Sequence, residues 1–311
     1  MSSSAKTLLV PSLKNILFAT DFSPCAQVVL PFLHDLALRY GAAIHVVHVI
    51  APEIRTAVPM DHIPELDVDQ SDAESALEAM QSGPCFSDIA HTAAVERGEV
   101  WDVLSSIVEE KKIDLIVLGT HGRRGLKKLV LGSTAEQVFR QARCPVLTIG
   151  PHITNLDMAR ASLAPILFAT DFSTGSRHAL RYAVSLARAN HTSLIMLHAV
   201  LPSVAVLPGS MDAMAANLDC GAELVQNAIA AAHRQMEELI SAEGLRELTP
   251  EIVIDCGEAD ALILNTAESK KAGLIVMGAH RASTHSVAPY MPSTASCVVR
   301  EAHCPVLTVR S

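Results

Sequence analysis

The sequence predicts an α/β protein of two tandem, doubly wound domains, each with a five-stranded parallel sheet flanked by helices. A repeat is the first observation behind this prediction, because ILFATDFS stands at Ile16–Ser23 and again, unchanged, at Ile166–Ser173. Within each copy, short apolar runs alternate with helix-like segments, which is typical of parallel sheets covered on both faces. The length of 311 residues, 50% of them hydrophobic, is enough for two domains of ordinary size.

Three further pairs of segments repeat in the same order along the chain. They are RGEVWDVL from Arg97 with CGEADALI from Cys256, KKIDLIVLGTH from Lys111 with KKAGLIVMGAH from Lys270, and RCPVLTIG from Arg143 with HCPVLTVR from His303. Their separation grows along the chain, so the second copy carries extra residues in its middle. We therefore place the domains at residues 1–152 and 163–311, joined by a short linker.

The strands of the first copy are expected where short apolar runs occur between polar segments. The expected ranges are 15–20, 44–50, 88–95, 114–119 and 145–149.

The helices are expected from capping residues and from apolar periodicity. Ser23 and Pro24 provide an N-cap and a proline at the first helical position, and Gly41 follows the last turn, which predicts one helix over about 24–40. Residues 51–69 are rich in Pro and Asp and are expected to form a loop. The remaining expected helices are Asp69–Gln81, Glu99–Lys112, Thr134–Ala142 and, in the second copy, an enlarged amphipathic helix near 218–242.

Composition and charge exclude several classes of protein. The formal net charge of −9 is shared evenly between the halves, so neither half has the electrostatics of a nucleic-acid-binding domain. The start of the chain does not read as a signal peptide, and no apolar run reaches the length of a membrane span. Seven scattered cysteines without a C-x-x-C pair favour reduced thiols. We therefore expect a cytoplasmic protein that does not bind membranes.

A glycine-rich loop follows the fourth expected strand. In GTHGRRGLKKLVLGST, three glycines and a serine stand in the spacing G-x-x-G-x(9)-G-S, from Gly119 to Ser133. Glycines let backbone amides approach an anion closely, and the serine lies at the start of a helix, where N–H groups and the helix dipole favour phosphate. Two arginines and two lysines lie inside the same loop. A polyphosphate is the ligand that this loop predicts.

These residues resemble the universal stress protein family, specifically its ATP-binding branch, over nearly the whole chain. The motifs that carry the resemblance are ATDFS, HVI, GTHG, LGST and CPVLT. The resemblance implies a Rossmann-like fold of the adenine nucleotide alpha hydrolase type, with ATP as ligand and Mg²⁺ held only through the ATP phosphates. The implied nucleotide-binding residues are Ala19, Thr20, Asp21, Val49, Leu118, Gly119, His121, Gly122, Gly132, Ser133 and Thr134.

Some of these residues have a plainer alternative role. Asp21 is expected to accept a hydrogen bond from the ribose or base, and its alternative is to orient the turn before the first helix. His121 either contacts the nucleotide or is simply solvated. Val49 is expected to contact adenine and belongs to the core in either case. His48 and its repeat His198 are interpreted as structural strand residues, because His45 and His48 face opposite sides of one strand and cannot share a metal.

The second copy departs from the glycine spacing. Arg281 and Pro292 stand where the first copy has Gly122 and Gly132, and the residues between them include no lysine or arginine. Proline removes one N–H donor, and arginine cannot lie as close to a phosphate as glycine. Three residues of a degenerate second site persist, namely Asp171, Gly278 and Ser293. The sequence therefore predicts that only the first domain binds a nucleotide.

Three functions remain in competition. The first is a nucleotide-dependent regulatory module in the stress response. The second is a slow Mg-dependent ATPase or self-phosphorylating protein, with Ser133 or Thr134 beside the phosphates. The third is an oligomeric scaffold, since the resemblance implies pairing through the last strand of each domain and a homodimer. The sequence contains no Walker A motif and no kinase catalytic loop, so we assign no catalytic residue.

Overall fold

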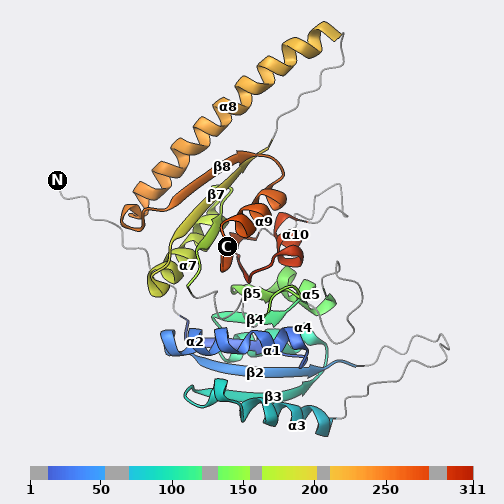
Figure 1. The fold of residues 1–311 in the computed structure, drawn as a ribbon. Helices are drawn as coiled ribbons and strands as arrows, with labels where there is room; N and C mark the ends of the chain where they lie inside the picture. The colour runs from blue at the N-terminus through green and yellow to red at the C-terminus, as the bar shows by residue number, and fades with distance from the viewer. Residues whose placement is uncertain are drawn as a thin grey trace, which may run out of the picture. The chain divides into compact units, whose positions relative to one another are not determined.

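A computed structural model describes residues 13–52, 70–120, 132–154, 163–201, 211–279 and 293–310. The chain forms two compact units, and Ser12–Ala159 makes up the first while the second contains Arg160–Ser311. Both are α/β structures with parallel sheets, as the sequence predicts (Figure 1). No helix in the described ranges has both the length and the apolar character needed to cross a membrane.

The sheet of the first unit is parallel throughout, with strand order β3-β2-β1-β4-β5. Its register pairs Ile16 of the central strand with Ile44 on one side and Leu115 on the other. The order runs one way from β1 to β3 and the other way from β4 to β5, which places the topological switch point between β1 and β4. The strands are β1 (Asn15–Ala19), β2 (Ala43–Ile50), β3 (His91–Arg97), β4 (Leu115–Gly119) and β5 (Val146–Ile149).

The third strand begins at His91, three residues later than the start expected at residue 88. Pro84 begins a short 3-10 helix after Gly83, and turns follow it up to Ile89. Pairing with β2 starts only at His91, which lies opposite Ile44. The local chain reversal at Gly83 and Pro84 therefore delays the strand.

The single helix expected over 24–40 is in fact two helices that meet at Val29. Pro31 stands at the second position of the following helix, and a proline there cannot donate a hydrogen bond to the carbonyl four residues earlier. The helix consequently breaks before the proline. The helices of the first unit are α1 (Pro24–Val28), α2 (Leu30–Tyr40), α3 (Gln70–Gln81), η1 (Pro84–Phe86), α4 (Val100–Glu110) and α5 (Ser133–Gln141). Most of the expected loop over 51–69 lies outside the described residues.

The second unit repeats this arrangement with strand order β8-β7-β6-β9-β10. Its helix after the first strand is continuous, because Arg181 stands where the first unit has Pro31. The strands are β6 (Ile166–Ala169), β7 (Leu194–Val200), β8 (Glu251–Cys256), β9 (Leu274–Gly278) and β10 (Val306–Val309). The helices are α7 (Thr174–Asn190), α8 (Met211–Ala242), η2 (Arg246–Leu248), α9 (Ala259–Ser269) and α10 (Thr294–Glu301).

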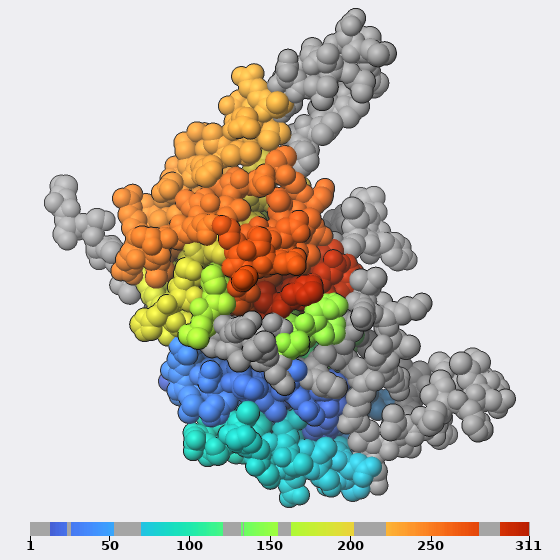
Figure 2. Space-filling view, viewed as in Figure 1, coloured from blue at the N-terminus to red at the C-terminus, as the bar shows by residue number. Residues whose placement is uncertain are grey.

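Helix α8 begins at Met211, about two turns earlier than the expected start near residue 218. It packs against β8 and β7 through a buried stripe near its C-terminal end, which includes Ala232, Met236 and Leu239. Other residues of that end, in orange, lie on the surface (Figure 2). The spacing of the buried stripe is that of one helix face, so packing against the sheet decides which side faces inward.

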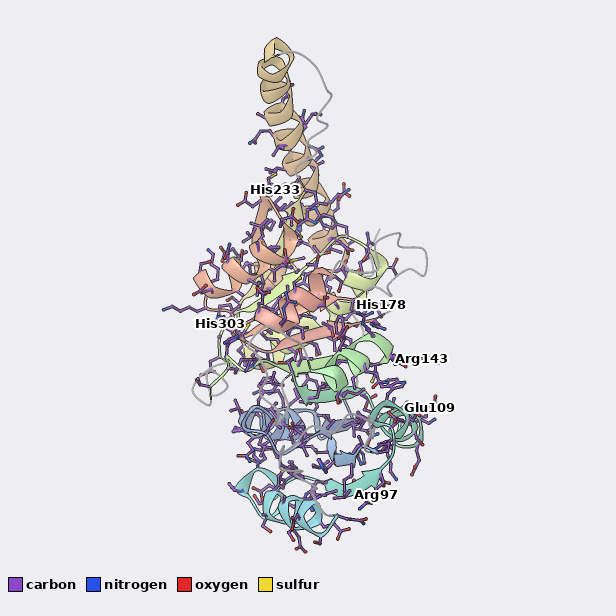
Figure 3. All side chains as sticks on the ribbon, turned by 90° about the vertical axis from the view of Figure 1, so that its right-hand side faces the viewer. Arg97, Glu109, Arg143, His178, His233 and His303 are labelled. Carbon is purple, nitrogen blue, oxygen red and sulfur yellow. The ribbon has the colours of Figure 1, made fainter. Side chains whose placement is uncertain are left out.

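The cores lie where the central strands are covered on both faces. Ile16, Leu17 and Phe18 of β1 are fully buried, and so is the equivalent run in β6. Charged side chains such as Arg97 and Glu109 lie on the surface, where they point away from the ribbon (Figure 3). This burial on both faces is the arrangement expected for a parallel sheet.

The end of the helix after the first strand offers a matched test of backbone strain. Gly41 and His191 both terminate their helices in the left-handed conformation, with φ of 59° and 51°. We expect Gly41→Ala to lower the free energy of unfolding by about 1 kcal/mol, because a Cβ is disfavoured there. His191→Gly, which removes a Cβ, should raise it. Urea denaturation followed by circular dichroism measures both, and equal effects of the two substitutions would contradict the prediction.

Candidate functional site

The candidate site of the first unit lies at the carboxyl ends of β1 and β4, beside the switch point. β1 ends at Ala19 and is followed by Thr20 and Asp21, while β4 ends at Leu118 and Gly119. Parallel strands paired in this order bring both ends to the same edge of the sheet. The structure therefore brings together the residues expected from two distant parts of the sequence.

A hydrogen-bonded turn holds Asp21 in place. The Thr20 hydroxyl oxygen accepts from the Phe22 N–H at 3.0 Å, and Asp21 Oδ1 accepts from the Ser23 N–H at 3.0 Å. Ser23 Oγ in turn accepts from the Ala26 N–H at 3.3 Å and caps α1. Phe22 has a φ of 60°, which is uncommon for a residue with a side chain. Asp21 thus orients the turn, the plainer of its two expected roles, and its carboxylate has enough lone pairs to serve a ligand as well.

The same turn occurs in the second unit with nearly equal distances. The Phe172 N–H donates to the Thr170 hydroxyl oxygen at 2.9 Å, the Ser173 N–H donates to Asp171 Oδ1 at 3.0 Å, and Phe172 has a φ of 62°. Because it recurs in both copies, this turn is a property of the fold and does not by itself mark a ligand site.

A histidine supports each turn from the neighbouring strand. His48 Nδ1 lies 2.7 Å from the Thr20 carbonyl oxygen and His198 Nδ1 lies 2.8 Å from that of Thr170. A carbonyl can only accept, so Nδ1 carries the proton in both rings. His48 also packs on the Phe22 ring, with centroids 4.7 Å apart. The structural role expected for these histidines is confirmed, and no group of metal-ligating side chains is found among the described residues.

Apolar residues of the candidate site belong to the core of the first unit. Leu118 is buried, and Ala19 and Val49 pack as partly buried residues against the same cluster, which also contains Leu104 and Ala135. Val49 therefore has the core role that was expected whether or not it also contacts a ligand.

Helix α5 begins beside these strand ends with a glycine cap. The Gly132 N–H donates to the Thr120 carbonyl oxygen at 2.9 Å, and a Cβ built on Gly132 would lie 3.0 Å from that oxygen. Gly132 has no side chain that could accept from the first-turn N–H groups of Ser133 and Thr134. No N-cap side chain therefore satisfies these donors, and a helix start of this kind favours an anion. His121 and Gly122 lie outside the described residues, as does the side chain of Ser133.

Helix α10 of the second unit begins differently. Ser293 is its N-cap, and its hydroxyl oxygen accepts from the Ser296 N–H at 3.2 Å. At the equivalent position of α5, the Glu136 N–H donates to the Gly132 carbonyl oxygen at 2.8 Å.

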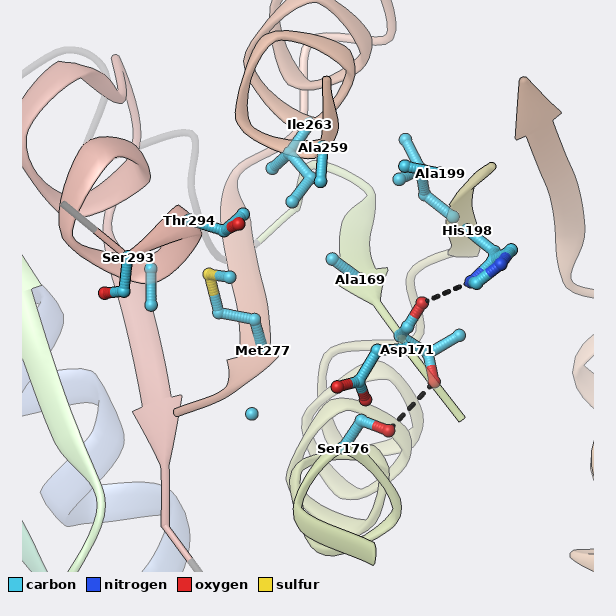
Figure 4. A pocket seen from close by; sticks show the side chains of 14 residues that line it. Ala169, Asp171, Ser176, His198, Ala199, Ala259, Ile263, Met277, Ser293 and Thr294 are labelled. Atoms are coloured by element: carbon cyan, nitrogen blue, oxygen red, sulfur yellow. Dashed lines mark hydrogen bonds between the residues drawn. The ribbon is translucent and has the colours of Figure 1, made fainter. Parts of the chain in front are cut away.

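The three residues expected in the second unit do meet, around a cavity of about 270 Å³ at the carboxyl end of its sheet (Figure 4). Asp171, Gly278 and Ser293 all line it. His198, Ser176 and Ile263 also line the cavity, although sequence reasoning did not select them for it. The repeat could have identified these three residues, because they are the equivalents of His48, Ala26 and Leu104 in the first unit.

Gly278 has a packing role at the edge of this cavity. A Cβ built on it would lie 2.8 Å from the backbone nitrogen of Ser176, at the start of α7. This close approach is sufficient to explain why a glycine stands at the end of β9, independently of any ligand.

Cysteine chemistry is disfavoured at the start of β5. Burial raises the pKa of the Cys144 thiol to about 11. The thiolate is the reactive form of cysteine, so this residue is a poor nucleophile near neutral pH.

Comparisons of the sequence and of the fold with known proteins identify the same family. The model of the universal stress protein family matches residues 12–150 and 163–310. Universal stress protein A homolog 1 of Coxiella burnetii is 33% identical over 141 residues, which are 44% of this chain and 95% of that protein. A crystal structure of a universal stress protein from Archaeoglobus fulgidus has a TM-score of 0.65 at 23% identity, covering 95% of this chain and 98% of its own, and supports the fold.

The close contact at Gly278 predicts a stability effect. Gly278→Ala should lower the free energy of unfolding by about 1–3 kcal/mol, because a Cβ would press on the backbone of α7. Met277→Leu at the preceding residue, which conserves volume, is the matched control and should change it by less than about 1.5 kcal/mol. Urea denaturation measures both, and a Gly278→Ala protein as stable as the unaltered chain would refute the packing role.

Proposed function

The chain belongs to the universal stress protein family, and from this we propose that it binds one ATP molecule, in its first unit. Mg²⁺ would be held through the ATP phosphates alone. The nucleotide would control the conformation or partner choice of a cytoplasmic regulatory protein of the stress response.

The glycine-capped start of α5 at the switch point is the observation that carries this proposal. Its first-turn N–H groups have no acceptor from an N-cap side chain, and the helix dipole places partial positive charge there. Two arginines and two lysines precede it in the sequence, in an otherwise acidic chain. Asp21 stands across the same sheet edge as an acceptor for ribose hydroxyls.

Two features of the second unit support a stoichiometry of one ATP per chain. Ser293 caps α10 with its own hydroxyl, and Pro292 before it has no N–H to donate. A phosphate would therefore find fewer donors at this helix than at α5.

Released nucleotide tests the proposal directly. Protein purified without added nucleotide, then saturated with ATP, freed of excess and denatured, should release about one ATP per chain by chromatography and mass spectrometry. Two ATP per chain, or none, would overturn it. Release of ADP that accumulates with time would instead favour the slow ATPase.

Charge removal at Asp21 tests which unit holds the ATP. Asp21→Asn keeps Oδ1 as the acceptor for the Ser23 N–H and removes the charge that would accept from the ligand. We expect ATP affinity to fall about tenfold, since losing one hydrogen bond to a charged group costs at least about 1.4 kcal/mol. Asp171→Asn is the matched control, with the same turn, and should leave ATP affinity unchanged by calorimetry. The reverse pattern would place the nucleotide in the second unit.

We also propose a homodimer. Light scattering of the full chain at micromolar concentration should give about twice the chain mass, and a strict monomer would contradict this.

A further inference from the structure

Strand β3 lies at one edge of the first unit's sheet, next to β2 (Figure 1). The Ile44 N–H donates to the Ala90 carbonyl oxygen at 2.9 Å, and the Gly98 N–H donates to the Ile50 carbonyl oxygen at 3.2 Å. Because successive residues of a strand point their backbone groups to opposite sides, the even-numbered residues of β3 bond to β2. The residues that point their N–H and C=O groups outward are His91, Ala93, Val95 and Arg97.

This edge lacks the features that usually block sheet edges. An exposed edge pairs readily with a further strand unless lysine, proline, a bulge or a covering element prevents it. β3 contains no proline or lysine, and its register with β2 runs without interruption from His91 to Arg97. In the part of the chain that the structure describes, no other strand pairs with its outward groups. These groups are therefore available to a second strand.

A second copy of β3 fits this edge when it runs antiparallel about a twofold axis at Ala94. Ala93 then lies opposite Val95 of the partner subunit, and His91 lies opposite Arg97 of the partner subunit. Facing residues that point their backbone groups at each other exchange two hydrogen bonds in an antiparallel pair. In this register every outward N–H and C=O group of both strands has a partner.

The side chains on the other face of β3 suit the same register. Thr92 and Glu96 are both exposed, and the axis places each of them opposite the other residue of the second copy. They form the closer, non-hydrogen-bonded kind of pair, in which side chains interact directly. Glu96 is the one acidic residue of β3, so it faces a threonine and not a second carboxylate.

The equivalent edge of the second unit, β8, is less suited to such pairing. The Gly257 N–H donates to the Val200 carbonyl oxygen at 3.0 Å, so the even-numbered residues of β8 point outward. These are only three residues, namely Ile252, Ile254 and Cys256. β8 also carries two acidic residues, Glu251 and Asp255. It therefore provides a matched control for β3.

Charge near β3 determines how salt affects the pairing. Helix α3 packs on β3 and carries three acidic residues, Asp72, Glu74 and Glu78, without a lysine or arginine. Pairing of two copies brings two such helices to the same axis, where their exposed carboxylates repel each other. Salt screens repulsion between exposed charges. Association through β3 should therefore become stronger as the salt concentration rises.

We propose that two copies of this chain associate through β3, by antiparallel pairing about Ala94 that makes the first-unit sheet continuous across the dimer. This inference rests on the homodimer proposed above and gives it a surface. It does not depend on ATP binding.

Proline tests the intermolecular hydrogen bonds on the full chain. Ala93→Pro removes an outward N–H and leaves the bonds with β2 in place, and edge strands tolerate proline in this orientation. Sedimentation equilibrium should give a dissociation constant at least tenfold higher than that of the unaltered chain. Ile252→Pro, at the equivalent outward position of β8, is the matched control and should leave the constant unchanged. Circular dichroism reports whether both variants are folded.

Charge at Thr92 tests the register without changing any backbone group. Thr92→Glu places a carboxylate opposite Glu96 of the partner subunit and should weaken the dimer, whereas Thr92→Lys should strengthen it. Both variants lose the contact between Thr92 Oγ1 and His45 Nδ1 at 2.9 Å, so the difference between them reports charge. For the unaltered chain, raising NaCl from about 0.05 M to about 0.5 M should lower the dissociation constant.

Two results would overturn the inference, and they differ in what they leave standing. If Thr92→Glu and a folded Ala93→Pro dimerise as tightly as the unaltered chain, the homodimer stands but uses another surface. If the unaltered chain stays monomeric at every concentration and salt level, the homodimer fails together with the inference. If Ala93→Pro does not fold, equal dissociation constants for Thr92→Glu and Thr92→Lys overturn the inference by themselves.

Discussion

The turn that leaves the central strand of each sheet determines the geometry on which both candidate sites depend. In the first unit the Thr20 hydroxyl oxygen accepts a hydrogen bond from the Phe22 N–H. The positive φ of Phe22 then turns the chain into a helix that Ser23 caps. His48 braces the turn by bonding to the Thr20 carbonyl. Because the aspartate lies inside this network, its carboxylate is held at the carboxyl edge of the sheet before any ligand binds. Preorganised polar groups lower the ordering cost of binding.

The two units differ where the last helix begins. In α5 the cap is Gly132, which has no side chain, whereas in α10 the cap is Ser293, which bonds to its own helix. The two caps stand one position apart in the repeat, because Pro292 is the equivalent of Gly132 and Ser293 is the equivalent of Ser133.

Most of the fold was predictable because short stretches of the sequence indicate its strands and helices. The apolar runs predicted the strands on both sides of the switch point, and the repeat of ILFATDFS predicted that the second unit resembles the first. The errors have local causes too. Pro31 breaks the first helix at Val29, although the capping residues before and after it indicated one continuous helix. The third strand starts at His91 because a 3-10 helix and its turns occupy the residues before it.

The sequence by itself determined the duplicated α/β fold, the position of Asp21 and the unequal glycine loops, because periodicity and motif spacing are written along the chain. Only the tertiary structure decided what Asp171, Gly278 and Ser293 do together. The sequence identified them only as the persisting residues of a degenerate second site, and the folded chain arranges them around one cavity with mostly apolar walls. A cavity depends on the volumes of side chains from several strands and helices, and such packing in three dimensions has no periodic signal in the sequence.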